Sequence, residues 1–250
     1  GVTMMLEAIR HTNESTRFYQ ASSSELFGNV GLEGCPKGLD ESSAFRPASP
    51  YAAAKLYGHF ITSIYREAYG LFAVNGILFN HESPLRGLEF VTRRISNAVA
   101  KISLGLQKGL TLGNLKARRD WGYAPEYVEA MWKMLQQDEP EDYVIATGES
   151  HSVEEFAKVA FQQVGLEWSD HVREDESLKR PLDVDDLRGD CSKANKGLDW
   201  KPKTTFKELV AIMVDEDIKR WKRYQNGEMF PWDAASYPEK LKIKTRSLRS

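Results

Sequence analysis

Two short stretches of the sequence carry side chains whose types and spacing suit proton transfer. Tyr51 and Lys55 lie four residues apart in a segment with helical spacing, so both side chains share one face of the predicted helix. A phenol has a pKa of about 10 and is a weak base at neutral pH, but an ammonium group beside it favours the phenolate. The pair is therefore a candidate for general acid–base catalysis.

The second stretch is a run of three serines that ends in Glu25. It follows a predicted strand over residues 17–21, and open α/β sheets bind ligands at the carboxyl ends of their strands. Together the two stretches form a Ser-Tyr-Lys constellation with an added carboxylate. Each residue also has a purely structural interpretation, Tyr51 as a tyrosine packed at a helix start and Glu25 as an acid in a loop.

The elements that must position these residues are predicted from the spacing of apolar side chains. Residues 2–11 and 51–69 have helical spacing, whereas 17–21 and 71–80 are predicted strands, the second an apolar run typical of a buried parallel strand. The glycine- and proline-rich segment 27–50 is predicted to be a loop over the site. This α-β-α-β order predicts half of a doubly wound sheet.

The rest of the chain continues to alternate helices and strands. Loops are predicted over 81–87 and 118–121, and no element is assigned over 168–189. Ser152 and Glu155 have the spacing of a capping box at a helix start. The other predicted helices are 91–106, 126–137, 153–164, 192–197 and 207–224, and the other predicted strands are 110–115 and 143–147.

The composition argues against several classes of function. The 250 residues suffice for a full hydrophobic core, and the net charge of −2 offers no basic field for nucleic acid. Cys35 and Cys191 lie far apart without metal-ligand spacing, as expected for thiols in a reducing compartment. No apolar run approaches the ~18 residues of a membrane span, and no signal peptide is visible. We therefore expect a cytoplasmic protein without a metal ion, a nucleic-acid partner or a membrane segment.

Four longer stretches carry a resemblance to a known family. They are residues 18–28 (FYQASSSELFG), 75–84 (NGILFNHESP), 119–122 (RDWG) and 129–132 (EAMW). The chain resembles the extended short-chain dehydrogenase/reductases and, within them, the GDP-mannose 4,6-dehydratase family. The similar stretches occur in the same order and run from about residue 18 to residue 221.

The resemblance implies a doubly wound, Rossmann-like α/β fold with a smaller C-terminal substrate-binding domain. The expected partial dinucleotide-binding domain comprises residues 1–82 and 117–148, the nucleotide-sugar substrate domain 83–116 and 149–225, and the polar tail 226–250. In the family a glycine-rich turn opens the protein and holds the dinucleotide pyrophosphate, and this sequence contains no such motif. We expect the sequence to be part of a longer protein, the alternative being a truncated paralogue that borrows the missing half.

The resemblance also implies a role for each residue of the constellation. Tyr51 would take the proton of the sugar 4-hydroxyl while hydride leaves C4, and Lys55 would assist it and bind the nicotinamide ribose. Ser23, at a position where the family usually has threonine, would hydrogen-bond the 4-oxygen, a role that Ser24 could share. Glu25 would remove the C5 proton, which the C4 ketone acidifies, while water leaves C6.

The implied cofactor is NADP, although the sequence leaves NADP against NAD open. Leu85 stands where the family has the first of two adjacent arginines. The sequence therefore does not decide whether this loop contacts a phosphate or another subunit. The implied cofactor contacts are Ala21, Tyr51, Lys55, His81 and Arg86.

The implied substrate is GDP-mannose. Arg119 and Arg180 are candidates for its pyrophosphate, because a guanidinium fork matches phosphate oxygens in a bidentate way, although either could form a surface ion pair instead. Asp183, where close relatives have glutamate, would bind the nucleotide ribose. Tyr123 and Glu126 also differ from the residues usual in the family, so the sequence does not fix the identity of the nucleotide base. The other implied substrate contacts are Ser23, Ser24, Asn80, Val91 and Arg94.

We therefore interpret the chain as a nucleotide-sugar 4,6-dehydratase that converts GDP-mannose to GDP-4-keto-6-deoxymannose and works as a homo-oligomer, a dimer or a tetramer. Hydride taken from C4 would return to C6. One alternative is a GDP-sugar reductase or epimerase of the same family, which would not need Glu25. The other is a non-catalytic nucleotide-sugar-binding remnant, which would need neither Glu25 nor Tyr51 and Lys55.

Overall fold

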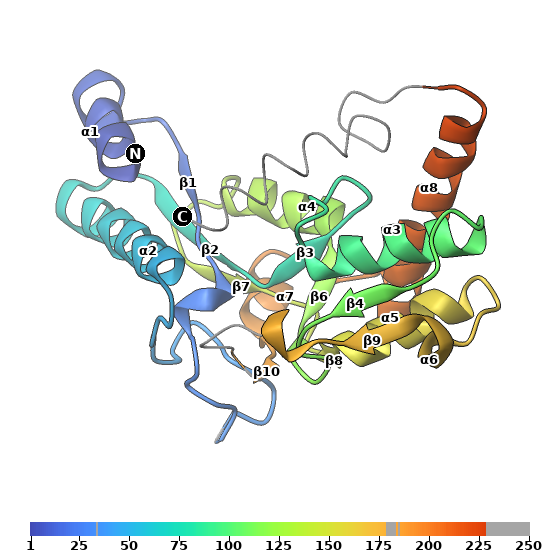
Figure 1. The fold of residues 1–250 in the computed structure, drawn as a ribbon. Coiled ribbons are helices and arrows are strands. Elements are labelled where there is room, and N and C mark those ends of the chain that lie inside the picture. The colour runs from blue at the N-terminus through green and yellow to red at the C-terminus, as the bar shows by residue number, and fades with distance from the viewer. Residues whose placement is uncertain (34, 179–183, 185, 229–250) are drawn as a thin grey trace.

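A parallel sheet lies at the centre of the computed structural model, which describes residues 1–33, 35–178, 184 and 186–228. Its strands follow the order β1 (Phe18–Ala21), β2 (Ala73–Leu78) and β7 (Tyr143–Ile145) (Figure 1). Ala21 pairs with Gly76, and Leu78 pairs with Ile145. All six residues of β2 are buried, as expected for a strand covered on both faces.

Helices cover both faces of this sheet. The helices α1 (Val2–Thr12) and α2 (Pro50–Tyr69) pack on one face, where Phe18 and Ala73 join a cluster with Leu6 of α1 and Tyr65 of α2. The helix α4 (Ala124–Met134) packs on the other face, against the neighbouring residues Tyr19 and Val74. Because successive strand residues point to opposite faces, these contacts define a doubly wound sheet, and the predicted fold class is confirmed.

The ends of α2 follow from its sequence. Ser49 caps the first turn, since its Oγ accepts a hydrogen bond from the Ala52 N–H at 3.0 Å, and Pro50 is the first helical residue. The helix stops at Gly70, which has a φ of 68° in the left-handed region. The position of Tyr51 in the first turn of α2 is thus set by its immediate neighbours.

A second region has its own hydrophobic core and lies on the right in Figure 1. It contains Ile95, Val99, Phe156, Phe161 and Met213, all buried. These residues come from α3 (Val91–Ser103), α5 (Val153–Gln162) and α8 (Phe206–Gln225). Beside them β4 (Leu110–Leu112) pairs in parallel with β9 (Val172–Glu174), which follows α6 (Trp168–His171).

Several short strands correct the sequence-based assignment. The predicted loops over 81–87 and 118–121 contain the last two residues of β3 (Asn80–Glu82), all of β5 (Arg118–Arg119) and the start of β6 (Trp121–Tyr123). The unassigned segment 168–189 contains α6, β9, the 3₁₀ turn η2 (Glu176–Leu178) and β10 (Asp186–Leu187). Strands of two or three residues show no periodicity, and they form only because distant partners pair with them. Thus β3 pairs with β6, and β5 pairs with β10 and with β8 (His151–Ser152).

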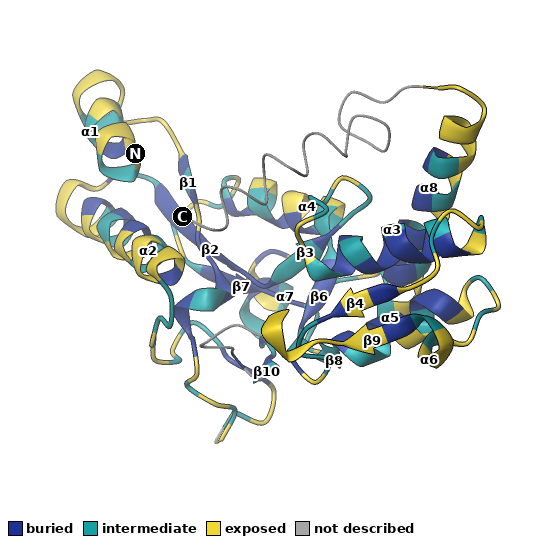
Figure 2. Cartoon of the chain, in the orientation of Figure 1, coloured by how far each residue is buried: buried dark blue, intermediate teal, exposed yellow. Residues whose placement is uncertain are grey.

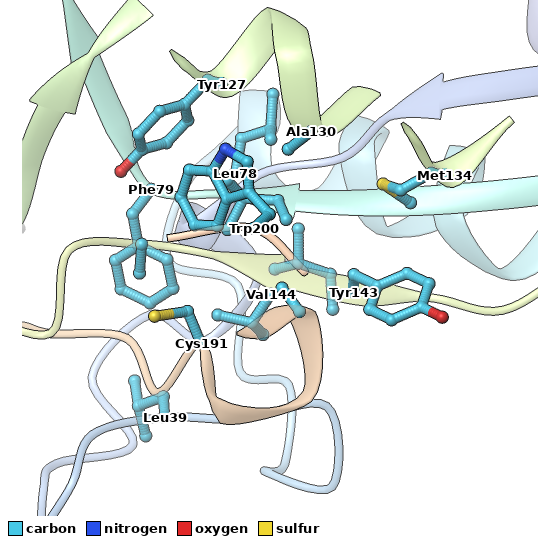
Figure 3. Close-up of a cluster of buried hydrophobic side chains, with 14 of the residues drawn as sticks. Leu39, Leu78, Phe79, Tyr127, Ala130, Met134, Tyr143, Val144, Cys191 and Trp200 are labelled. Carbon is cyan, nitrogen blue, oxygen red and sulfur yellow. The ribbon is translucent and has the colours of Figure 1, made fainter. Parts of the chain in front are cut away.

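The burial pattern matches this layering. Figure 2 shows the central strands β2 and β7 buried and the helices α1 and α2 with exposed outer faces, whereas β9 is largely exposed. The cluster drawn in Figure 3 joins strand residues such as Val144 to Tyr127 of α4 and to Trp200, which follows α7 (Ser192–Gly197). Side chains such as Cys191, Ala194 and Trp200, from the predicted substrate domain, therefore also pack against the central sheet. The division of the chain into two domains stays a prediction.

In the part of the chain that the structure describes, no helix combines the length and the apolar character that crossing a membrane requires.

Candidate active site

The serine run forms a tight turn where β1 ends. The Ser22 N–H donates to the Gly76 carbonyl oxygen at 3.0 Å, which extends the pairing with β2 by one bond. The 3₁₀ turn η1 (Ser24–Leu26) follows, and the Ser23 Oγ accepts the Glu25 N–H at 3.2 Å. Because that bond uses an oxygen lone pair, the Ser23 hydroxyl proton stays available to a ligand. Glu25 is half-buried, and its carboxylate has no hydrogen-bond or ion-pair partner among the described residues.

The chain after η1 is held back against it. Gly28 has a φ of 52°, and a Cβ at this position would collide with the Arg46 carbonyl oxygen. The Arg46 N–H in turn donates to the Leu26 carbonyl oxygen at 2.8 Å. The long loop between β1 and α2 is therefore closed at its base, which restrains Glu25.

Tyr51 and Lys55 face the same strand end from α2. The Tyr51 side chain is 56% exposed, and the Lys55 Nζ lies 5.7 Å from its ring centroid. The same Nζ donates to the Ala21 carbonyl oxygen at 2.8 Å, and burial lowers the pKa of Lys55. We call residues 22–25 together with Tyr51 and Lys55 the catalytic corner. The structure brings these predicted residues together, and their roles stay predictions.

A second group of predicted site residues lies on β3. The His81 ring stacks on Tyr127 with centroids 5.0 Å apart, and its Nδ1 lies 2.8 Å from the Phe79 carbonyl oxygen. Burial lowers the pKa of His81 and favours the neutral ring. The Asn80 Oδ1 is buried and makes no hydrogen bond in the described part of the chain. An unpaired buried acceptor of this kind is suited to a ligand donor.

Arg86 lies beside a buried acid that the sequence analysis missed. Glu82 is only 1% exposed, and its carboxylate accepts the Thr92 hydroxyl at 2.7 Å. The same carboxylate lies 3.3 Å from the Arg86 Nε, which makes no hydrogen bond to the described residues. Burial raises the pKa of Glu82 to about 7, and Arg86 and Thr92 oppose this rise. The guanidinium also lies 3.5 Å from the Phe90 ring centroid. The only sequence signal for this contact was the four-residue spacing of Glu82 and Arg86. Such spacing predicts a contact only within a helix, and Glu82 lies at the end of a strand.

Two arginines hold the segment that carries Arg86, which we call the Arg86 loop (residues 83–90). The Arg93 Nη1 donates to the Arg86 carbonyl oxygen at 2.9 Å, and the Arg220 Nη1 donates to the Pro84 carbonyl oxygen at 2.5 Å. Both arginines contact Asp217, which is 1% exposed and lies 2.7 Å from the Arg93 Nη2. A buried ion pair between α3 and α8 therefore anchors this loop.

The remaining predicted substrate residues lie on other elements. Val91 begins α3, and the Arg94 Nη2 donates to the Thr111 carbonyl oxygen at 2.9 Å. Arg119 lies on β5, and its Nη1 donates to the Val184 carbonyl oxygen at 2.5 Å. Arg180 and Asp183 lie outside the described residues.

Asp120, beside Arg119, is a second buried acid that the sequence analysis did not assign. Its carboxylate accepts hydrogen bonds from the N–H groups of Thr147, Gly148 and Gly189 and from the Thr147 hydroxyl. Burial nevertheless raises the pKa of Asp120 to about 6. Asp120 thus fixes the strand that carries Arg119 to the chain segments after β7 and β10. No group of three His, Cys, Asp or Glu side chains among the described residues could hold a metal ion.

The doubly wound sheet with a Tyr-x-x-x-Lys helix beside its first strand defines a Rossmann-like α/β protein of the short-chain dehydrogenase/reductase type. Solved structures agree on the fold. An RMD protein from Pseudomonas aeruginosa complexed with NADPH matches with a TM-score of 0.80 at 22% identity, covering 88% of this chain and 72% of that one. A dTDP-glucose 4,6-dehydratase from Bacillus anthracis in complex with NAD matches with a TM-score of 0.77 at 20% identity, covering 91% and 69%.

Sequence comparison narrows the class to one family. The family model described as GDP-mannose 4,6 dehydratase matches residues 1–213. GDP-mannose 4,6 dehydratase 1 of Arabidopsis thaliana is 54% identical over 227 residues, which cover 89% of this chain and 62% of that protein. The GDP-mannose 4,6 dehydratase of Homo sapiens is 50% identical over 246 residues, covering 91% and 65%. The chain belongs to the GDP-mannose 4,6 dehydratase family, and it spans somewhat less than two thirds of the length of these relatives.

Proposed function

We propose that this chain carries the catalytic residues of a GDP-mannose 4,6-dehydratase, which forms GDP-4-keto-6-deoxymannose. The observation that carries the proposal is the Glu25 carboxylate, which has no partner in the described part of the chain and lies two residues after Ser23 at the end of β1. A 4,6-dehydratase needs a base for C5 at this place, in addition to the groups that oxidise C4. Family membership supports the same assignment.

A nicotinamide dinucleotide is the cofactor that this chemistry requires. The residues present suit it, because the exposed phenol of Tyr51 and the amine of Lys55 meet at the carboxyl end of β1, where open sheets bind such ligands. When bound, the cofactor supplies the hydride acceptor for C4 and the hydride donor for C6. We propose NADP, with Arg86 as the cation beside it. The residues that would hold it are Ala21, Tyr51, Lys55, His81 and Arg86.

The catalytic corner divides the proton transfers between two groups. Tyr51 takes the proton of the 4-hydroxyl, and the Lys55 ammonium stabilises the phenolate by its charge. Ser23 donates its hydroxyl proton to the 4-oxygen and holds the sugar in place. Once C4 is a ketone, the C5–H is acidic, and Glu25 removes this proton and delivers it to the hydroxyl that leaves C6 as water. Return of hydride to C6 leaves an enolate at C5, which takes the proton that Tyr51 removed from the 4-hydroxyl, so both groups regain their starting states.

Substrate binding is assigned to residues that do not react. Arg119 and Arg180 bind the pyrophosphate, Asp183 binds the nucleotide ribose, and the Asn80 Oδ1 offers a buried acceptor to the substrate. Val91 and Arg94, on the first turn of α3, complete the proposed substrate side together with Ser24. Because these groups contact non-reacting parts, they contribute mainly to binding.

We also propose that the protein is cytoplasmic and homo-oligomeric. Tyr57, Phe60 and Ile64 form an exposed apolar stripe on the outer face of α2, each more than half exposed. Apolar patches of this kind mark interaction surfaces, which supports a contact between copies. Light scattering should therefore give the mass of a dimer or tetramer, and Phe60→Glu should reduce it.

The direct test of the function is to incubate the full-length protein with GDP-mannose, using NADP and NAD in parallel. Mass analysis should show the loss of one water molecule from the sugar nucleotide, with NADP the more effective cofactor. A change of configuration without loss of mass would indicate an epimerase. Binding of GDP-mannose without any reaction would indicate a non-catalytic remnant.

A further inference from the structure

His59 is a buried histidine on the helix that carries Tyr51 and Lys55, one turn beyond Lys55. The residue is 6% exposed. Its Nδ1 lies 3.3 Å from the Ser22 Oγ, and its Nε2 lies 3.9 Å from an oxygen of Asp142. The ring thus lies between the serine turn at the end of β1 and a carboxylate beside β7.

Both neighbours of this ring favour the same tautomer. With the proton on Nε2, the positive end of the N–H lies on the side of the negative Asp142 carboxylate, which at 3.9 Å acts by charge and not by a hydrogen bond, and Nδ1 accepts the Ser22 hydroxyl proton. With the proton on Nδ1, the lone pair of Nε2 would face that carboxylate. Burial also lowers the pKa of His59, in line with a neutral ring.

The partner beyond His59 is held independently of it. Asp142 accepts bonds from Arg66 at 2.7 and 3.1 Å and from the Asn75 N–H at 2.8 Å. The Asn75 side chain also donates to the His59 carbonyl oxygen at 3.2 Å. These bonds therefore keep the negative charge of Asp142 at a fixed position on the Nε2 side of the imidazole.

Aromatic contacts orient the ring from the outside. The ring centroid of Phe45 lies 5.0 Å from that of His59 and the centroid of Phe60 lies 5.7 Å away, both edge to face. Rotation of the imidazole about its own axis would break these contacts. The direction in which Nδ1 presents its lone pair to Ser22 is therefore set by packing.

We propose that His59 is a positioning residue, which holds Ser22 and through it Ser23 and Glu25 at a fixed distance from Tyr51. Lys55 makes the first link between α2 and the strand end, to the Ala21 carbonyl oxygen, and His59 makes the second link one residue further on. The bond from Lys55 to Ala21 is partly exposed to solvent. The bond between Ser22 and His59 is buried, so it is kept when water or ligands enter and leave the catalytic corner. The kinetic part of this inference rests on the proposed function.

The test compares two variants of nearly equal shape in the full-length protein. His59→Asn keeps an acceptor near the position of Nδ1, whereas His59→Leu removes it, and both lose the ring contacts with Phe45 and Phe60. A displacement of about 1 Å can cost on the order of 10²-fold in rate. We expect kcat for GDP-mannose to fall about 10- to 100-fold in His59→Leu and less than about 3-fold in His59→Asn, with KM unchanged in both.

A double-mutant cycle separates positioning from general destabilisation. Ser22→Ala removes the other end of the bond, so it should lower kcat about as much as His59→Leu does. The two changes together should cost no more than either alone, because they remove the same link. Equal kcat in His59→Asn and His59→Leu, or full additivity with Ser22→Ala, would overturn the inference.

A spectroscopic measurement keeps the inference testable if a variant fails to fold. In the unaltered protein, ¹⁵N NMR of the imidazole should show His59 neutral, protonated at Nε2 and accepting at Nδ1, and Ser22→Ala should shift the Nδ1 resonance. A proton on Nδ1 would overturn the proposed link. If the unaltered protein leaves GDP-mannose unchanged, the proposed function fails while this measurement still decides the Ser22–His59 bond.

Discussion

The catalytic corner and the Arg86 loop are supported in opposite ways. In the catalytic corner the Tyr51 side chain is more than half exposed, and the corner is supported by the bond from Lys55 to the Ala21 carbonyl oxygen and by the buried side chain of His59. The Arg86 loop is supported by a buried ion pair between Arg93 and Asp217. In addition, the Glu82 carboxylate contacts the guanidinium of Arg86.

The difference suggests a division between chemistry and binding. A group that exchanges protons must change charge during turnover, so its charged neighbour must tolerate both states. The partly exposed Lys55 ammonium, 5.7 Å from the Tyr51 ring centroid, does so, whereas a buried counter-ion in direct contact would hold the group in one state. An arginine that only binds an anion keeps its charge, and a buried ionic anchor keeps it in place. We therefore expect changes in the catalytic corner to alter rate, and changes around the Arg86 loop to alter stability, binding and pH dependence.

The largest effect should come from Tyr51→Phe. It removes the base for the 4-hydroxyl, so turnover should fall by about 10²–10⁴-fold, and no reduced cofactor should form. Stopped-flow absorbance with GDP-mannose measures both. Tyr57→Phe on the same helix, which loses only an exposed hydrogen bond to Thr3, is the matched control and should retain its rate. Normal cofactor reduction in Tyr51→Phe would remove this residue from the chemistry.

Asp217→Asn should have the next largest effect, on stability. It removes the carboxylate charge that faces the buried Arg93 guanidinium at 2.7 Å, and breaking a buried ion pair of this kind costs about 3–5 kcal/mol of the free energy of unfolding. Urea denaturation measures this loss. Glu228→Gln is the control, because its pair with Arg223 is about half exposed and contributes less than ~1 kcal/mol. Equal losses in the two variants would contradict the anchoring role of the buried pair.

Arg180→Ala should weaken binding of the sugar nucleotide by about 1.5–3 kcal/mol, the value of one charged hydrogen-bonding partner. Because the pyrophosphate does not react, the loss should be seen in KM while kcat changes little. Steady-state kinetics over a range of GDP-mannose concentrations separates the two. A large fall in kcat at constant KM would reject the assignment of Arg180.

The smallest effect is the pH dependence caused by Glu82. Burial raises the pKa of Glu82 in the folded protein to about 7, above the ordinary value of 4.5. Between these values the folded protein binds the extra proton, so stability falls as pH rises, by about 1 kcal/mol between pH 6 and 8 from this group. Glu82→Gln should remove that part of the slope in urea denaturation. An unchanged slope would show that Glu82 is ionised in the folded protein throughout this range.

Local patterns predicted the elements whose signals are local. The helix predicted over 51–69 is α2, which begins one residue earlier at Pro50. The predicted capping box of Ser152 with Glu155 formed with both hydrogen bonds at 3.0 Å. Thr205 and Glu208 have the same signal and form the same box, but it was missed, and the predicted start of α8 fell one residue late. The pairing of Tyr51 with Lys55 likewise followed from helical spacing.

Contacts between distant residues could not be predicted in this way. Ser22 and His59 are 37 residues apart, and Arg93 and Asp217 are 124 apart. No periodicity links such pairs, because only the packing of α2 on β1, or of α3 on α8, brings them together. The four-residue step from Lys55 to His59 was the one local hint. The contacts that hold the site residues in place could therefore be identified only from the structure.

The most direct test of the account is Glu25→Gln in the full-length protein. The change preserves size and hydrogen bonding but removes the base for C5, while Tyr51 and Lys55 are untouched. Stopped-flow absorbance with GDP-mannose should show reduced cofactor accumulating on the enzyme, and overall dehydration should fall by about 10²–10⁴-fold. Dehydration at the unmodified rate would contradict the account, since Glu25 would then be an acid in a loop and the chain a reductase or an epimerase.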